Sequence, residues 1–352
     1  MSCYYVGLDV HKASICIAVL NAEGKLVMES VVETSAATVL DFLKGLRGQV
    51  EVTFEEGTHA AWLYDVLKKT TAQVIVCDPR KNRLLSDGNK SDKVDARKLA
   101  QLLRAGLLSP VYHGQHGTRD LKELVRSYEY LVEDSTRVMN RIKALYRSRA
   151  IACAGTDVYK SRPREAWLAK LPEAGVQARA RRLFSELDHL TGLRHEARQA
   201  LVTECRRHPA SRLLMRVPTL GIIRIAQLIA YVVTPHRFRG KRQFWAYCGL
   251  AVVTKSSADY RVTGVELRRT RKAATRGLTQ SYNRTLKYVF KSAALTASRC
   301  GPFKAWYAEP VERGLRPELA RVTIARRIAA ITLAVWKSGE VFDAEKLIRL
   351  AA

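Results

Sequence analysis

Short apolar runs and helical periodicity alternate along the N-terminal third of the chain. Runs rich in β-branched and aromatic residues, bounded by turn signals such as Asn21-Ala22-Glu23-Gly24, are typical of strands. They predict strands at residues 4–8, 14–20, 26–32, 51–54 and 73–77. Apolar positions three and four residues apart predict helices at residues 36–46, at 61–68 and from 92 onward. The apolar stripe of the last helix consists of Leu99, Leu102, Leu103 and Leu107.

Acidic residues occupy the ends of several of these predicted elements. The order of the elements is three strands in a meander, followed by helix, strand, helix, strand and helix. This is the order of an α/β ribonuclease-H-like fold, in which the first and fourth strands end side by side and the last helix packs across them. Asp9 ends the first strand, Glu55 and Glu56 follow the fourth, and Asp92 and Asp95 begin the last helix.

These carboxylates are expected to meet around a divalent cation. Asp92 and Asp95 are three residues apart, so they share one face of the helix. Like charges that approach each other closely must be protonated or neutralised by a cation. Oxygen ligands suit Mg²⁺, and such ions serve phosphodiester chemistry. For the aspartate pair alone, the alternative is a solvated helix N-terminus, where Asp is favoured by the unpaired amides and the dipole.

The middle of the chain has the pattern of two long amphipathic helices. Apolar residues recur at steps of three and four from Leu121 to Leu145, and again from Leu183 to Leu201. Two such helices fit an antiparallel hairpin within one chain, and they also fit a coiled-coil seam between two chains. The basic residues between positions 141 and 164 suit either phosphate contact or a solvated helix face.

The last part of the chain is more basic and mainly helical. Val217-Pro218-Thr219-Leu220-Gly221 precedes an apolar helix predicted at residues 222–231, an arrangement similar to a helix-hairpin-helix element that presents backbone amides to phosphate. From Lys255 to Lys291 there are ten basic residues and two acidic ones, interleaved with tyrosines. Cationic density with aromatic side chains suits nucleic-acid binding.

Composition narrows the class of protein. The 352 residues are enough for two domains or more, and the hydrophobic content of 47% excludes a wholly disordered chain. The formal net charge of +27 indicates a polyanionic partner. We expect neither a membrane span nor a secretory signal peptide, since no apolar run is long enough and Asp9, His11 and Lys12 interrupt the N-terminal one. The seven scattered cysteines favour reduced thiols and a cytoplasmic protein over a zinc ribbon.

Several motifs together resemble the DEDD transposases of insertion sequence 110 type. They are Gly7-Leu8-Asp9-Val10-His11-Lys12, Phe54-Glu55-Glu56-Gly57-Thr58 with Trp62, Cys77-Asp78-Pro79, and Ser91-Asp92-Lys93-Val94-Asp95-Ala96-Arg97. The resemblance implies a RuvC-like N-terminal domain, similar to Holliday-junction resolvases. It places the acidic tetrad of the family on Asp9, Glu55, Asp92 and Asp95, with Mg²⁺ or Mn²⁺ as cofactor. Glu56 is the alternative to Glu55.

The same resemblance implies a serine nucleophile in a C-terminal transposase domain. The family has a Gly-Leu segment followed, eight residues after the glycine, by this serine, and counting from Gly249 gives Ser257. Ser256 is the neighbouring register. The basic residues nearest to it are expected to bind nucleic acid: Lys255, Arg261, Arg268, Arg269, Arg271, Lys272 and Arg276.

The sequence thus predicts three parts: a RuvC-like DEDD domain at residues 1–108, a helical coiled-coil spacer at 109–210 and a C-terminal transposase domain at 211–352. The resemblance implies a DNA transposase or recombinase that forms a covalent phosphoserine with donor and target DNA. It also implies a guide (bridge) RNA in some members, and homodimers that assemble into tetramers, acting in the cytoplasm at a prokaryotic nucleoid. The alternatives are a metal-dependent Holliday-junction resolvase or nuclease that uses the tetrad alone, and a basic architectural binder without enzymatic activity.

Overall fold

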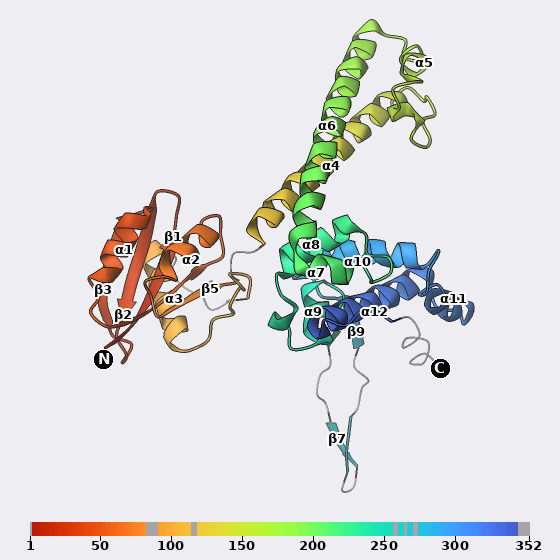
Figure 1. Ribbon diagram of the computed structural model, residues 1–352. Helices are drawn as coiled ribbons and strands as arrows, with labels where there is room; N and C mark the ends of the chain where they lie inside the picture. The colour runs from red at the N-terminus through yellow and green to blue at the C-terminus, as the bar shows by residue number, and fades with distance from the viewer. Residues whose placement is uncertain are drawn as a thin grey trace. The chain divides into compact units, whose positions relative to one another are not determined.

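The computed structural model describes residues 2–81, 91–113, 118–255, 260–263, 266–269 and 274–343. It divides into two compact units, Met1–Gln115 and His116–Ala352 (Figure 1). Within the described ranges, no helix combines the length and the apolar character that crossing a bilayer requires. All seven cysteines are free.

The first unit is a mixed α/β sheet with helices on its faces. Its strands are β1 (Cys3–Val10), β2 (Ser14–Leu20), β3 (Leu26–Glu33), β4 (Gln49–Glu55) and β5 (Gln73–Cys77). Its helices are α1 (Ala36–Lys44), α2 (Ala60–Leu67) and α3 (Asp92–Arg104). The strand order is β3-β2-β1-β4-β5, with β1, β2 and β3 antiparallel and β1, β4 and β5 parallel. This arrangement confirms the mixed α/β N-terminal domain and fits a ribonuclease-H-like fold.

The two faces of this sheet carry side chains of different size. Large apolar residues of alternate strand positions, such as Val6 and Leu8, form a core with α1 and α2. The intervening positions of β1 and β2 face α3 and are small: Gly7, Cys16 and Ala18. Because side chains alternate along a strand, the face with large residues packs against α1 and α2, and the face with small residues lets α3 approach closely.

Gly7 allows α3 to lie directly on β1. A Cβ atom at this glycine would stand 2.1 Å from the carbonyl oxygen of Ala96 and 2.6 Å from the amide nitrogen of Ala100. Both atoms belong to the backbone of α3, so no side chain can move aside to make room. The first turn of α3 is held by Ser91, whose hydroxyl accepts a hydrogen bond from the Val94 N–H at 3.4 Å.

The second unit begins with a long helical hairpin. The two long helices predicted from the apolar spacing are α4 (Arg119–Arg147) and α6 (Ala174–Arg207), which pack against each other. Their connection contains the 3-10 turn η2 (Asp157–Tyr159) and the short helix α5 (Arg164–Leu168). A separate hydrophobic cluster fills the end of the hairpin that includes this connection, and it contains Tyr146, Leu168 and Phe184.

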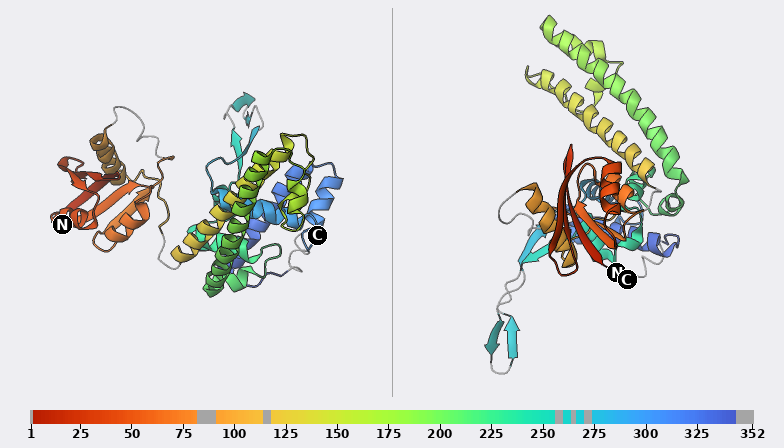
Figure 2. Two further views of the ribbon diagram at one scale, coloured as in Figure 1. Left: turned by 90° about the horizontal axis from the view of Figure 1, so that it is seen from above. Right: turned by 90° about the vertical axis from the view of Figure 1, so that its left-hand side faces the viewer.

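The C-terminal helices form the largest hydrophobic cluster. The elements are α7 (Pro209–Leu214), α8 (Ile222–Val232), η3 (Pro235–Arg237), α9 (Lys241–Tyr247), α10 (Arg284–Ala297), α11 (Ala305–Glu312) and α12 (Pro317–Ser338). Leu121 and Val125 of α4 and Leu201 of α6 belong to the same cluster, so the base of the hairpin is anchored in these helices. Figure 2 shows the hairpin helices and the C-terminal helices from two further directions.

Two strand pairs interrupt the otherwise helical C-terminal region, and the sequence analysis did not predict them. Strand β6 (Val252–Lys255) pairs with β9 (Ala274–Leu278), and β7 (Tyr260–Thr263) pairs with β8 (Glu266–Arg269). The pairs are antiparallel. The alternating run from Tyr260 to Arg269 has the period-2 pattern of a hairpin, and its high charge hid that pattern.

Candidate metal centre

The end of two parallel strands places Asp9 beside Glu55. β1 pairs with β4 in parallel, with Leu8 opposite Phe54, so the next residue of each strand lies at the same end of the sheet. Leu8 and Phe54 both point into the core under α1 and α2. Because side chains alternate along a strand, Asp9 and Glu55 lie on the opposite face, which α3 covers.

Helix α3 brings its own two carboxylates to the same place. Asp92 is its first residue, and Asp95 follows three residues later on the same face. The contact between Gly7 and the backbone of α3 sets the height of the helix above β1. A close-packed glycine and a capped helix N-terminus thus position the aspartates over the end of the strand.

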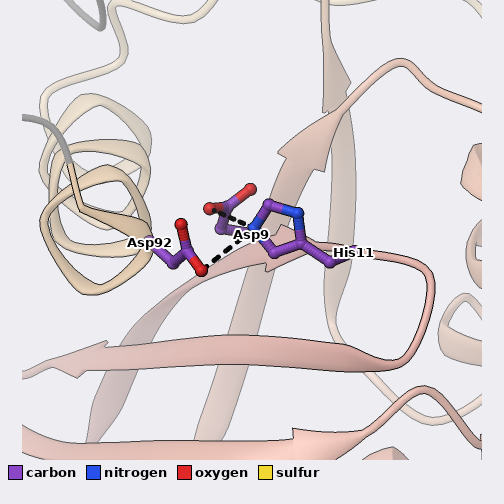
Figure 3. Close-up of side chains that lie close together, drawn as sticks. All are labelled: Asp9, His11 and Asp92. Atoms are coloured by element: carbon purple, nitrogen blue, oxygen red, sulfur yellow. Dashed lines mark hydrogen bonds and ion pairs between the residues drawn. The ribbon is translucent and has the colours of Figure 1, made fainter.

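Three side chains form the tightest group of this site: Asp9, His11 and Asp92 (Figure 3). The Nε2 atom of His11 lies 3.1 Å from Oδ2 of Asp9 and 3.5 Å from Oδ2 of Asp92. One donor atom from each residue lies within 4.8 Å of the other two. The imidazole therefore bridges a carboxylate of the sheet and a carboxylate of the helix.

Burial and like charge both act on the two strand-end carboxylates. Burial raises the pKa of Asp9, His11 lowers it, and the charges of Asp92 and Asp95 raise it again. Burial also raises the pKa of Glu55, with further contributions from the charges of Asp9 and Asp95. Asp95 and Glu55 therefore lie within electrostatic range of Asp9, around the tight group of three. The site concentrates negative charge where solvent neutralises it poorly.

The donor set fits a hard divalent cation. Oδ1 of Asp95 is buried and accepts no hydrogen bond from the residues that the structure describes. It forms an ion pair with Nζ of Lys98 at 3.9 Å, which is too long for a hydrogen bond. A divalent cation would bind this oxygen directly, because carboxylate oxygens are the ligands that Mg²⁺ and Mn²⁺ prefer. His11 adds one nitrogen donor to this oxygen-rich group.

The neighbouring glutamate has a different environment. Oε2 of Glu56 lies 2.6 Å from Nε2 of His113, and the Glu56 side chain is 44% exposed. Its amide donates a hydrogen bond to the carbonyl of Cys77 on β5. The geometry therefore brings Glu55, rather than Glu56, toward Asp9 and Asp95.

His11 is the residue that the sequence analysis quoted within a motif without giving it a role. Its distance of two residues from Asp9 could have indicated a role. A residue two positions after Asp9 at a strand end lies on the same face, and a histidine there is within reach of the same carboxylates. The loop after β1 is also fixed, because the carbonyl of His11 accepts a hydrogen bond from the Thr34 hydroxyl.

The expected serine and the expected basic residues belong to the segment between residues 255 and 276. Ser257, Ser256, Arg271 and Lys272 lie outside the described residues. The structure describes only the backbone of the remaining basic positions: Lys255 ends β6, Arg261 lies opposite Arg268 in the β7–β8 pair, Arg269 ends β8 and Arg276 lies in β9.

The turn before β6 packs closely against the segment that precedes α10. Gly249 has a φ of 66°, and a Cβ atom there would stand 2.5 Å from the ring of Tyr282. The Thr279 amide donates a hydrogen bond to the carbonyl of Ala251 at 2.9 Å, which joins the two ends of the β6–β9 segment. The Gly-Leu pair noted in the sequence thus lies where the chain leaves the helical core.

Two family models of transposases match the chain. A family model of DEDD transposases of IS110, described as "Transposase", matches residues 6–148. A second model, described as "Transposase IS116/IS110/IS902 family", matches residues 211–308. The first match contains the acidic positions, the second contains Ser257, and residues 149–210 lie between them.

A curated relative carries the same description. The protein named "Transposase for insertion sequence element IS1533", from Leptospira borgpetersenii, is 29% identical over 177 residues. The alignment covers 47% of this chain and 50% of the relative, so the chain matches half of that protein's length.

Proposed function

Because the chain belongs to the IS110-type family of transposases, we propose that it is a DNA transposase that cuts and rejoins strands to move an insertion sequence. The observation that carries this proposal is the meeting of Asp9, His11 and Asp92 at the end of β1, with Asp95 and Glu55 in electrostatic range. A structural protein would gain nothing from carboxylates that raise one another's pKa. The net charge of +27 supports a nucleic-acid substrate.

Asp9, Glu55, Asp92 and Asp95 would hold the divalent cation, Mg²⁺ or Mn²⁺. When bound, such a cation neutralises the phosphate and stabilises charge that develops on its oxygens. The chain supplies the ordered ligands. β1 and β4 fix Asp9 and Glu55 in the sheet, α3 fixes the aspartate pair, and Nε2 of His11 lies beside one oxygen of Asp9 and one of Asp92.

Ser257 is the proposed nucleophile. Its Oγ would form a bond to a DNA phosphorus while the bond from that phosphorus to a deoxyribose oxygen breaks. The serine proton is lost, and the departing oxygen takes up a proton as a hydroxyl. Attack by the deoxyribose hydroxyl of the exchanged strand then restores a phosphodiester and frees the serine, so rejoining needs no outside energy source.

The proposed partners are donor and target DNA, a bridge RNA that pairs with both, and further copies of the chain as a dimer that assembles into a tetramer in the cytoplasm. The turn before α8 supports a phosphate contact of the helix-hairpin-helix type. Thr219 there has a φ of 71°, and its carbonyl accepts a hydrogen bond from Arg224 at 2.6 Å. The amides of the first turn of α8, which have no acceptor within the helix, follow this turn.

Trapping on DNA tests the proposal. We expect the chain, incubated with a labelled duplex carrying an end of its own element, to give a protein–DNA adduct that survives denaturation. Ser257→Ala should abolish the adduct, whereas Ser256→Ala should retain it. Hydrolysed ends without an adduct, lost on Asp9→Asn, would instead indicate a metal-dependent resolvase or nuclease. Unchanged activity in Asp9→Asn would contradict the role of the acidic site.

A further inference from the structure

The end of the α4–α6 hairpin carries more positive charge than its own structure uses. We define the hairpin tip as residues 138–188, with η2 and α5 between the two long helices (Figure 1). Its hydrophobic cluster is separate from that of the C-terminal helices. Most of the tip, from residue 149 onward, lies outside both family matches. The positive charge of this part of the tip therefore does not follow from the matches to the two family models.

The carboxylates of the tip are all engaged by basic partners. There are five of them, and each lies within ion-pair distance of an arginine or lysine. The pairs are Arg141–Glu186, Arg149–Glu173, Lys160–Asp157, Arg164–Asp188 and Arg181–Glu165. Arg164 also lies over the ring of Phe184 at 4.9 Å, which ties its ion pair to the core of the tip.

Six basic residues of the tip remain without an ion pair to any residue in the described part of the chain. They are Lys143, Arg147, Arg162, Lys170, Arg179 and Arg182. Two of them lie over aromatic rings instead: the Nζ of Lys170 is 3.9 Å from the centre of the Trp167 ring, and that of Lys143 is 5.3 Å from the centre of the Tyr159 ring. Lys143 also donates a hydrogen bond to the carbonyl of Gly155 at 2.8 Å, which leaves its charge without a carboxylate. Arg179 and Arg182 are three residues apart and share a face of α6.

This surface fits a phosphate backbone better than a protein partner. Protein interfaces have an apolar or aromatic centre, and none of the large exposed apolar side chains in the described ranges lies in the tip. Cations that no carboxylate of the tip compensates instead suit the charge of a duplex, where each neutralised phosphate releases a counterion.

We propose that the hairpin tip binds the backbone of double-stranded DNA through these six cations. The choice of DNA rests on the proposed function, whose substrate is a duplex. The contact is sequence-independent and lies on a part of the chain that contains neither the acidic site nor the serine. The tip would therefore hold DNA without taking part in the strand chemistry.

The test compares two triple variants of the full chain with equal loss of charge. The first, Arg147→Gln, Arg179→Gln and Arg182→Gln, removes unpaired cations. The control, Arg137→Gln, Lys160→Gln and Arg181→Gln, removes cations that are paired with carboxylates, Arg137 with Asp134 just before the tip. Binding of a fluorescent 30-base-pair duplex is measured by anisotropy in EDTA over a range of salt, with an RNA hairpin of equal charge as second probe.

For DNA, we expect the unpaired-cation variant to lose about tenfold in affinity or more. The slope of log affinity against log salt concentration should become less steep by about 2 to 3. The control should lose less than about threefold. Equal losses in both variants, no loss in either, or a loss restricted to RNA would overturn the proposal. If the triple variant melts early, Arg147→Gln and Arg179→Gln are measured singly against Lys160→Gln. EDTA excludes metal-dependent chemistry, so failure of the adduct experiment would leave this result standing.

Discussion

The Asp9 carboxylate lies at the end of a strand, under a helix that adds two further carboxylates, and burial raises its pKa. A raised folded-state pKa means that this group stabilises the fold most at a pH below its unfolded value, near 4. That stability is lost as the pH rises through the folded value. Without metal, Asp9→Asn should therefore raise the stability of the first unit by about 1 kcal/mol at pH 7, and the gain should vanish toward pH 3.

Hydrogen exchange of β1 and α3 across this pH range checks that expectation, because it reports on the first unit alone. Addition of Mn²⁺ should make the parent chain more stable than the Asp9→Asn variant. The parent chain should gain about 3 kcal/mol at a hundredfold excess over the dissociation constant, and the variant should gain much less. An Asp9→Asn chain that is destabilised at pH 7 without metal would count against the electrostatic argument.

Glu55 and Glu56 offer a matched pair of adjacent carboxylates. Glu55→Gln should weaken Mn²⁺ binding about tenfold or more, because it removes a charged oxygen from the group around Asp9. Glu56→Gln should leave the affinity nearly unchanged, since Glu56 contacts His113 instead. Titration calorimetry with Mn²⁺ measures both. A larger loss of Mn²⁺ affinity in Glu56→Gln than in Glu55→Gln would indicate that Glu56 is the metal ligand instead.

At this scale, the sequence located the acidic residues because strand ends and helix spacing are local properties. It favours Glu55 over Glu56 because Glu55 adjoins the strand. Alternation along β4 puts Glu55 on the face that α3 covers, which follows only once Phe54 is known to face the core. The contact of His11 with Asp92 depends on how far α3 stands from β1. The pattern of residues around His11 does not predict that distance. It depends on Gly7, which lets the backbone of α3 lie directly on β1.

Helix α3 depends on Gly7 for its position. Gly7→Ala should destabilise the first unit by about 1–3 kcal/mol or more, because the new Cβ meets backbone atoms of α3. It should also weaken Mn²⁺ binding by moving the aspartate pair. Gly57→Ala is the control, since nothing lies within 4 Å of a Cβ at that position. Thermal unfolding with and without Mn²⁺ measures both effects, and equal behaviour of the two variants would contradict the close-packing account.

The hairpin helix α4 is joined to α8 by a carboxylate network. Glu129 accepts hydrogen bonds from Gln227 at 2.8 Å and from the Tyr231 hydroxyl at 2.9 Å, and burial raises the pKa of Tyr231. Tyr231→Phe removes one donor from a partly buried carboxylate and should cost about 1–3 kcal/mol. Tyr130→Phe on the exposed face of α4 should change little. Chemical unfolding followed by circular dichroism compares them, and similar values would show that the network is not stabilising.

Elements with strong periodicity could be predicted from the sequence, and weakly patterned ones could not. The strands and helices of the first unit were predicted because their apolar runs are short, distinct and separated by turns. Strands β6 to β9 have four or five residues each, and each strand contains at least one charged residue. The pairing of β6 with β9 also depends on closure at Ala251 and Thr279, which lie far apart in sequence.

The whole molecule is characterised by its positive charge and by its division into two compact units. Nearly all of the net charge of +27 lies in the second unit, where 46 lysines and arginines face 20 aspartates and glutamates; the first unit has 14 and 13. The base of the hairpin shares a core with the C-terminal helices. The separate spacer domain at residues 109–210 stays a prediction. Oligomerisation through the hairpin also stays a prediction, because the apolar spacing fits pairing within one chain and between chains equally well.

The central claim is that the acidic group at the end of β1 holds a divalent cation. Anomalous X-ray diffraction from crystals of the full chain grown with Mn²⁺ tests it most directly. The account predicts a manganese peak about 2.2 Å from carboxylate oxygens of both Asp9 and Asp92. A well-ordered site with no peak there, or with manganese bound only elsewhere, would contradict it.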